Sequence, residues 1–405
     1  MTSRILVPQS PLTRESIRTA QGRIKRHLQK AAHQPRHQDI SDKRKAQPLT
    51  TDSVAPPSVR FFVKPDYHDD RRGVANAMEC LIEKKGLGEL QRSGVIAQSD
   101  GTDMQGIPHR LRTQQFLRTN AMPDLYVKQI AMAAKAYRIT TYALLPESTQ
   151  RSKIEDLQAY GVIVELSKDN GRGNRDLLAR TAAHLEAYQF PSRDEADVIQ
   201  GHGTVALELE DEVKSILETD GTIPNRGAGK LDIVIAIMGN GSALCGICMA
   251  FQQTGTRVFG AEMTSENGGN VRRDLAYSDK EEGGRYNNRS AFNAPMGALP
   301  WSVFTSPSML SGVLYVDKKA AELARGKLLE QLRVKVGPHD AAPLALGVYS
   351  EEFRQLLEKD TAEDRVWNVG VIIQSEISML ENERPKTLSE SLEDDLKHYM
   401  SDLWL

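Results

Sequence analysis

The sequence is poor in the features that define several specialised classes of protein. It contains three cysteines, Cys80, Cys245 and Cys248, an odd and sparse set that excludes a disulfide framework and predicts a reducing compartment. No run of about 18 apolar residues is present, so we expect no contact with a membrane and a cytoplasmic protein. The 52 basic and 54 acidic residues leave a net charge of -2, so no basic footprint argues for nucleic acid.

Strand and helix patterns alternate, with short links, over much of the chain. The segment Leu231–Ile237 (LDIVIAI) is almost continuously apolar, which is typical of a buried parallel strand. It is followed by a glycine-containing turn, a helix predicted over Ile247–Gln253 and a second buried strand, Arg257–Ala261. This alternation predicts an α/β fold with a doubly wound, mainly parallel sheet, in which ligands bind beyond the carboxyl ends of the strands.

The N-terminal part has two interpretations. Thr13–Ala32 is rich in arginine and lysine, as a mitochondrial presequence is, but Ile17, Ala20 and Ile24 fall at helical spacing. We favour an amphipathic helix packed on the body of the protein. Residues 33–57 are polar, contain proline and show no periodicity, so they predict an irregular connection. A further helix is predicted over Val74–Lys85.

The strongest local signal for a ligand is the turn MGNGSALCG after the apolar strand. Small residues there allow backbone N–H groups to approach an anion, and a helix N-terminus adds a favourable partial charge. The alternative is a tight turn that binds nothing, and the turn matches neither the dinucleotide nor the Walker pattern. The candidate phosphate-binding residues are Gly239, Asn240, Gly241, Ser242, Ala243 and Leu244.

Six segments, in order along the chain, resemble the serine/threonine dehydratase branch of the fold-type II pyridoxal-phosphate (PLP) enzymes. They are ESIRTAQGRIKRHL, ALLPESTQRSKIEDLQAYGVIVEL, VIQGHGTVALELEDEV, DIVIAIMGNGSALCGICMAF, VFGAEMTSEN and VGPHDAAPLAL. The resemblance implies two lobes with a cleft between them, mainly parallel twisted sheets flanked by helices, and a homodimer. It also implies an N-terminal helix and flexible connection over 1–57, a large domain over 58–95 and 190–405, and a small domain over 96–189.

The resemblance breaks down where the family holds its cofactor. The family's run Ser-Phe-Lys-x-Arg-Gly-Ala-x-Asn-Ala, which carries the Schiff-base lysine, matches HDDRRGVANA here and places Asp70 at the lysine position. An aspartate cannot form an imine with an aldehyde. The family's loop Ser-Ser-Gly-Asn-His reads SDGTD here, and its added carboxylates, including Asp103, would repel a phosphate or an amino-acid carboxylate. We therefore expect no cofactor, although PLP without the usual lysine remains an alternative.

Acidic and histidine side chains suggest a different chemistry for the same cleft. If the fold is as implied, Asp70 and Asp103 converge with Asp69 and Asp100, and such clusters suit general acid–base work. His68 and His202 lie on the same predicted rim. The alternative is that all of them are solvated turn residues. The predicted catalytic residues are Asp70, Asp103, His68 and His202.

Two further residues, Lys64 and Glu262, are candidates for the same cleft. Lys64 is the nearest lysine in sequence to Asp70 and is an alternative anchor, although the matching lysine of the family has a structural role. Glu262 matches a position that binds a divalent cation in some relatives, but Glu266 and Gly268 preserve that site only in part, so no metal is predicted.

These residues lead to one function and two alternatives. We expect a repurposed enzyme that acts without PLP on a small organic substrate, as a lyase, isomerase or cyclase in a biosynthetic, specialised-metabolism setting. The first alternative is a PLP-dependent dehydratase or racemase for amino acids with an altered anchor. The second is a non-catalytic relative that binds a ligand. A retained fold does not decide between them.

Overall fold

A six-stranded sheet and a four-stranded sheet form the framework of the chain. The computed structural model describes residues 12–31, 45–49, 58–66, 69–98, 123–147, 149–167, 175–219, 230–239, 241–264, 298–306, 308–359 and 366–374. None of the helices that it describes is long and apolar enough to cross a membrane. The predicted fold class is confirmed, because parallel sheets flanked by helices make up both parts of this framework.

The six-stranded sheet has the order β1-β2-β10-β7-β8-β9. Neighbouring strands are parallel except for β1 and β2, which run antiparallel. Every residue of β7 is buried, as the apolar run predicts. The strands are β1 (Gln47–Leu49), β2 (Ser58–Asp66), β7 (Ile233–Ile237), β8 (Arg257–Met263), β9 (Gly312–Val316) and β10 (Val366–Gln374).

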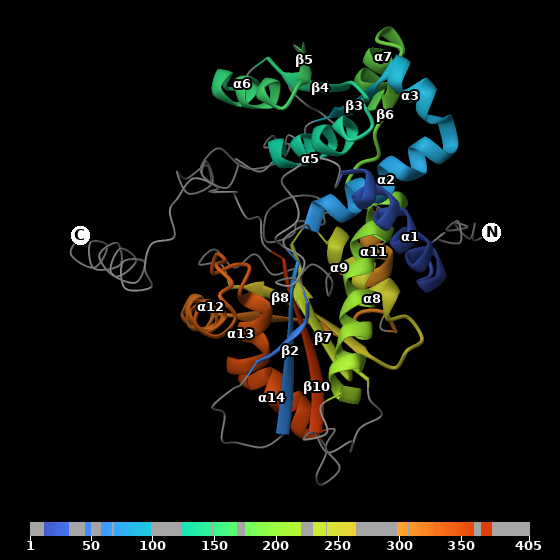
Figure 1. The fold of residues 1–405 in the computed structure, drawn as a ribbon. Coiled ribbons are helices and arrows are strands. Elements are labelled where there is room, and N and C mark those ends of the chain that lie inside the picture. The colour runs from blue at the N-terminus through green and yellow to red at the C-terminus, as the bar shows by residue number, and fades with distance from the viewer. Residues whose placement is uncertain are drawn as a thin grey trace, which may run out of the picture. The chain divides into compact units, whose positions relative to one another are not determined.

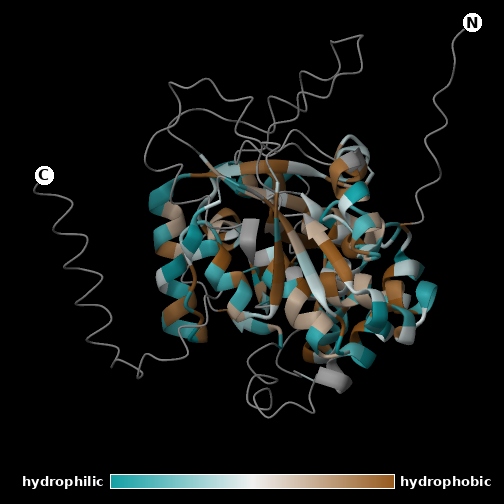
Figure 2. Cartoon of the chain, turned by 90° about the horizontal axis from the view of Figure 1, so that it is seen from above, coloured by the Kyte–Doolittle hydropathy of each residue, from teal (hydrophilic) through white to brown (hydrophobic). Residues whose placement is uncertain are grey.

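Helices cover both faces of this sheet (Figure 1). One face packs against α8 (Ala196–Thr219), α9 (Ser242–Ala250) and α11 (Ala298–Phe304), and the other against α12 (Lys318–Leu332), α13 (Ala342–Tyr349) and α14 (Glu351–Lys359). Apolar residues dominate the strands, whereas polar residues line the outer sides of the helices (Figure 2). The sheet is thus the middle of three layers, which explains why its strands are apolar on both faces.

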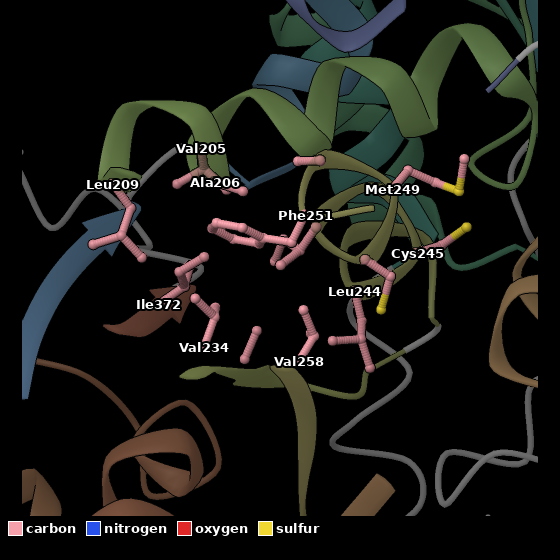
Figure 3. Packing of buried hydrophobic residues seen from close by; sticks show 14 of the residues in the cluster. Val205, Ala206, Leu209, Val234, Leu244, Cys245, Met249, Phe251, Val258 and Ile372 are labelled. Atoms are coloured by element: carbon pink, nitrogen blue, oxygen red, sulfur yellow. The ribbon is translucent and has the colours of Figure 1, made fainter. Parts of the chain in front are cut away.

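The core between the sheet and α8 is close-packed (Figure 3). Val234, Val258 and Ile372 project from three strands towards Leu209 of α8 and Phe251, the residue that follows α9. Each of these side chains is at most 3% exposed. Burial of one such side chain contributes roughly 1.5–3 kcal/mol, so this layer fixes α8 and α9 firmly on the sheet.

The four-stranded sheet is parallel throughout and has the order β5-β4-β3-β6. Its strands are β3 (Val95–Gln98), β4 (Thr141–Pro146), β5 (Val162–Ser167) and β6 (Tyr188–Gln189). Its helices are α5 (Pro123–Lys135), α6 (Arg151–Ala159) and α7 (Arg175–His184). Helices α2 (Asp69–Lys85) and α3 (Leu87–Ser93) connect the two sheets, and α2 shares a core with α5. The assignment of the sheets to two separate lobes stays a prediction.

Helix α1 (Arg14–Ala31) confirms the predicted packed helix. Ile17 and Ala20 are fully buried, and Ile24 is 5% exposed, so the apolar face lies against the body of the protein. Arg14 forms an ion pair with Glu210 of α8. The amphipathic pattern therefore serves tertiary packing.

Helix α8 contacts α2 on one side and α9 on the other, with backbone against backbone. A Cβ atom on Gly201 would lie 2.3 Å from the carbonyl oxygen of Arg72, and one on Gly203 would lie 2.6 Å from that of Gly246. Residues two apart on a helix project in nearly opposite directions, so these glycines face different neighbours. Gly201 and Gly203 therefore set the separation of α2 and α9 from α8.

The structure differs from the sequence-based expectation in three elements. Helix α2 begins at Asp69 instead of Val74, and α9 begins at Ser242 instead of Ile247, so both helices start earlier than the sequence predicts. Strand β1 lies within the connection that was predicted to be irregular, where it pairs with β2. The local sequence pattern does not predict these segments, because tertiary contacts stabilise helix or strand where the intrinsic propensity is weak.

Candidate functional site

The carboxyl ends of the parallel strands β2, β10, β7 and β8 meet at one edge of the large sheet. Asp66, the last residue of β2, pairs in register with Gln374, the last residue of β10. Strand β7 ends next to them at Ile237, and Glu262 lies near the end of β8. Asp66, Gln374 and Glu262 are each at most 4% exposed. Buried polar groups at this edge are typical of ligand sites in α/β proteins.

The predicted phosphate-binding turn lies at this edge, between β7 and α9. Gly239 and Gly241 both have positive φ angles, 50° and 89°, which turn the chain directly into the helix. The first helical hydrogen bond runs from the N–H of Cys245 to the carbonyl of Gly241. The N–H groups at Ser242, Ala243 and Leu244 precede it in the first turn of α9, where an α-helix offers no acceptor. They lie where an anion is favoured. Asn240 lies outside the described residues.

Helix α11 covers this turn. A Cβ atom on Gly241 would lie 2.9 Å from Cε2 of Phe304 and 3.4 Å from Cβ of Pro300. Phe304 is 5% exposed and belongs to the same core as α9. The position therefore requires glycine for two reasons, because of its φ angle and because α11 leaves no space for a side chain.

The predicted catalytic residues are only partly within the described structure. Asp70 lies in the first turn of α2, shortly after the end of β2. His68 and Asp103 lie outside the described residues, as does Asp100, and their convergence with Asp70 stays a prediction.

His202 is almost fully buried in α8. It is 2% exposed, and its Nε2 atom would lie 2.8 Å from a Cβ atom placed on Gly73 of α2. The imidazole thus packs on the backbone of α2, three residues after Asp70. Its predicted part in acid–base chemistry stays a prediction.

A network of buried charges joins β2, α2 and α8 at this end of the sheet. The Arg72 guanidinium contacts Asp66 at 2.9 Å and both oxygens of Glu208 at 2.6 and 2.9 Å. Burial alone would lower the pKa of Arg72, but the carboxylates of Asp66 and Glu208 outweigh it and raise that pKa. Burial alone would raise the pKa of Glu208, but Arg72 outweighs it and lowers that pKa.

Lys64 belongs to the same network. Its Nζ atom lies 2.6 Å from Glu212 and 3.3 Å from Glu208, and the residue is 1% exposed. With its ammonium group held by two carboxylates, Lys64 has the structural role that the family resemblance implies, which argues against the alternative anchor. The network was not predicted, although the spacing of Glu208 and Glu212, one turn apart on a helix, was a usable signal.

The cysteines take no part in this site. All three are free and buried, and burial raises the pKa of the Cys245 and Cys248 thiols. Among the residues that the structure describes, no group of three histidine, cysteine, aspartate or glutamate side chains is arranged to hold a metal. Glu266 and Gly268, the companions of Glu262, lie outside those residues.

Comparison with known proteins points to one family. The family model described as pyridoxal-phosphate dependent enzyme matches residues 127–363. Serine racemase from Bos taurus is 21% identical over 292 residues, covering 70% of this chain and 72% of the racemase. Serine racemase from Oryza sativa subsp. japonica is 25% identical over 235 residues, covering 56% and 62%. L-threo-3-hydroxyaspartate ammonia-lyase from Saccharomyces cerevisiae is 26% identical over 201 residues, covering 49% and 48%.

Solved structures share the fold. Maize serine racemase superposes with a TM-score of 0.59 and 22% identity, over 96% of this chain and 99% of the racemase. Serine racemase from Dictyostelium discoideum superposes with a TM-score of 0.59 and 20% identity, over 90% and 98% of the two chains.

The expectation that no cofactor is used is wrong. The family model that matches residues 127–363, more than half of the chain, describes enzymes that depend on pyridoxal phosphate. That expectation rested on two local departures, Asp70 and the acidic run SDGTD, whereas the family match extends over residues 127–363. The turn before α9 is compatible with a phosphate, so these departures do not exclude the cofactor.

Proposed function

Because this chain belongs to the family of pyridoxal-phosphate-dependent enzymes, we propose that it binds pyridoxal phosphate and acts on a small amino acid with a hydroxyl group on its β-carbon. The reaction would be racemisation or loss of ammonia. Serine and 3-hydroxyaspartate, the compounds named in the relatives' titles, both carry an amino group, a carboxylate and a β-hydroxyl. This is the amino-acid alternative that the sequence left open.

The observation that carries this proposal is the start of α9 at the carboxyl edge of the sheet. The backbone N–H groups of Ser242, Ala243 and Leu244 would hold the cofactor's phosphate, and the helix dipole would stabilise its charge. Gly241 permits the approach because it has no side chain. Phe304 packs behind Gly241 and would keep water from that side of the phosphate.

The anchor departs from the family pattern in this proposal. We place Asp70 at the position of the Schiff-base lysine, on the strength of the intact frame Arg72-Gly73-x-x-Asn76-Ala77. Within the described residues, Lys64 is the lysine nearest to that position in sequence, and its ammonium is held by Glu208 and Glu212. The cofactor would then be bound without a covalent link to the chain.

When bound, pyridoxal phosphate supplies an electron-withdrawing group that acidifies the hydrogen on the substrate's α-carbon. The chain's own part is to hold and orient. The α9 N-terminus would fix the phosphate, and the network of Arg72, Asp66 and Glu208 holds the start of α2 on the sheet edge. Asp70 would be the candidate group to hold a proton near the substrate amino group, because its position faces the reacting end of the cofactor in the family.

The test is reconstitution of the purified full chain with pyridoxal phosphate. We expect the cofactor to be retained on dialysis. L-Serine should yield D-serine or pyruvate, and L-threo-3-hydroxyaspartate should yield its α-carbon epimer or oxaloacetate. Gly241→Ala should weaken retention at least about tenfold. Gly326→Ala is the matched control, because nothing lies within 4 Å of a Cβ atom there. Failure to retain the cofactor at all would overturn the proposal.

A second candidate function is favoured by Asp70 itself. A chain that retains the cofactor but lacks the lysine could be a non-catalytic binding protein. The same experiment separates the two, because a binding protein would retain pyridoxal phosphate and show no turnover of any β-hydroxy amino acid.

A further inference from the structure

A polar cavity lies between α1, α2 and α8. It has a volume of about 220 Å³ and is lined by residues of all three helices, namely Ser16, Thr19, Arg23, Cys80, Glu83, Lys84, Asp197 and Gln200. This volume holds about seven water molecules at roughly 30 Å³ each. It suits a small molecule such as an amino acid and is too small for a nucleotide.

One side chain in this lining has an unused polar group. Gln200 is 7% exposed and lines the cavity, and no other residue in the described part of the chain hydrogen-bonds to its amide. Because Gln200 lines the cavity, a bound molecule there would supply the missing partner.

The charged residues of the cavity form ion pairs, but each pair leaves polar atoms that could bind a ligand. Arg23 binds Glu83 through Nε at 2.9 Å, and its two terminal nitrogens contact no other group that the structure describes. Lys84 binds Oδ2 of Asp197 at 2.7 Å, and Oδ1 of Asp197 likewise has no partner among the described residues. A cationic donor and an anionic acceptor therefore remain available on the same cavity.

This balance of charge selects the class of ligand. Arg26 binds the other oxygen of Glu83 at 2.6 Å and lies 3.6 Å from Glu79. Three cations and three carboxylates thus balance around the cavity, so a free anion or a free cation would add an unbalanced charge. A zwitterion enters with its own charges balanced, because its carboxylate meets the free nitrogens of Arg23 and its ammonium meets Oδ1 of Asp197. The geometry points to a binding site for a small zwitterionic amino acid, separate from the turn before α9.

An occupant of this site would contact the helices that frame the proposed catalytic site. Gln200 precedes Gly201, whose backbone lies against Arg72 and Gly73 at the start of α2. An amino acid bound to Arg23 and Asp197 would tie α1 to α8 beside that contact. A ligand in this cavity could therefore act as an effector of the neighbouring site. Its binding depends on the cavity residues alone and does not require the proposed catalysis.

Equilibrium dialysis of the full chain with labelled L-serine tests this inference. We expect saturable binding that persists in cofactor-free protein and in Gly241→Ala. Arg23→Gln and Asp197→Asn should each weaken it at least about tenfold, as loss of one charge-assisted hydrogen bond predicts. Arg354→Gln and Asp211→Asn are matched controls, because they make the same charge changes at exposed positions, Asp211 lying on α8 itself.

Two additional comparisons keep the test decisive. Gln200→Met has nearly the same shape and should fold, but it lacks the amide, so we expect it to weaken binding. It therefore tests the site even if the charge variants prove unstable. Ethanolamine lacks the carboxylate and 3-hydroxypropionate lacks the amino group, so both should bind at least about tenfold more weakly than L-serine. Absence of saturable L-serine binding, equal binding by all variants, or loss in Gly241→Ala alone would overturn the site. Equal binding of either analogue would overturn the zwitterion as its ligand.

Discussion

Arg72 of α2 and Glu208 of α8 form a two-point contact, with guanidinium nitrogens 2.6 and 2.9 Å from the two carboxylate oxygens. Arg72 also reaches Asp66 at the end of β2, and Glu208 is within 3.3 Å of Lys64. The contact therefore ties the start of α2, where Asp70 lies, to the sheet edge and to α8. Planar two-point pairs of this kind fix orientation as well as distance.

Replacing Arg72 should destabilise the fold strongly. Arg72→Met would leave Asp66, which is 2% exposed, and Glu208 without their counter-charge. We expect a loss of about 3 kcal/mol in the free energy of unfolding, measured by urea denaturation. Arg354→Met removes an arginine from an exposed pair with Glu351 and should change the free energy of unfolding little, because solvent screens this pair. If both changes lowered the free energy of unfolding equally, the buried network would contribute no more than an exposed ion pair.

The network should also make stability depend on pH in the acid range. The pKa of Glu208 is lowered in the folded state, since Arg72 outweighs burial. A lowered pKa contributes stability above the ordinary glutamate value of about 4.3, and this stability is lost as pH falls through the folded-state value. Glu208→Gln should therefore flatten the acid limb of the stability curve. The prediction would be contradicted if the free energy of unfolding fell equally in the wild type and in Glu208→Gln between neutral pH and a pH below about 4.

Gly201 should tolerate no side chain. Gly201→Ala would place a methyl group 2.3 Å from the carbonyl oxygen of Arg72, so α2 and α8 must separate. We expect a loss of about 1–3 kcal/mol by thermal or urea unfolding. The matched control is Gly326→Ala in the interior of α12, where a Cβ meets nothing within 4 Å. There the better helix former should raise stability by roughly 0.5–1 kcal/mol.

Asp70→Lys tests the placement of the anchor. With pyridoxal phosphate present, we expect borohydride reduction and peptide mapping to find the cofactor attached at residue 70, while the wild-type chain carries no lysine-linked cofactor. We do not expect full dehydratase activity, because Asp100 and Asp103 still replace the serine and histidine of the family's Ser-Ser-Gly-Asn-His run. Asp69→Lys is the control, since it turns the new amine by about 100° around α2. Attachment at Lys64 in the wild type would refute the placement.

The homodimer implied by the family resemblance is a further prediction. Light scattering of the purified chain at micromolar concentration should give twice the mass of one chain. A single-chain mass under those conditions would contradict it.

The amino-acid pattern was enough to predict the parallel α/β class, the buried strand β7, the packed helix α1 and a glycine turn between β7 and α9. These are local signals, because apolar runs, helical spacing and small residues act within a few positions of the chain. The family resemblance also followed from sequence, whereas the inference of a lost cofactor did not hold. Two local departures cannot outweigh a pattern that extends through the chain.

Tertiary structure alone decided which elements became neighbours. Strand β10, far along the chain and not predicted, inserts between β2 and β7, and this insertion brings Gln374 beside Asp66. Lys64 became a structural residue because α8 presents Glu208 and Glu212 to it, more than a hundred residues further along the chain. Pairings of this kind depend on contacts between distant segments, whose energies no local window of the sequence contains.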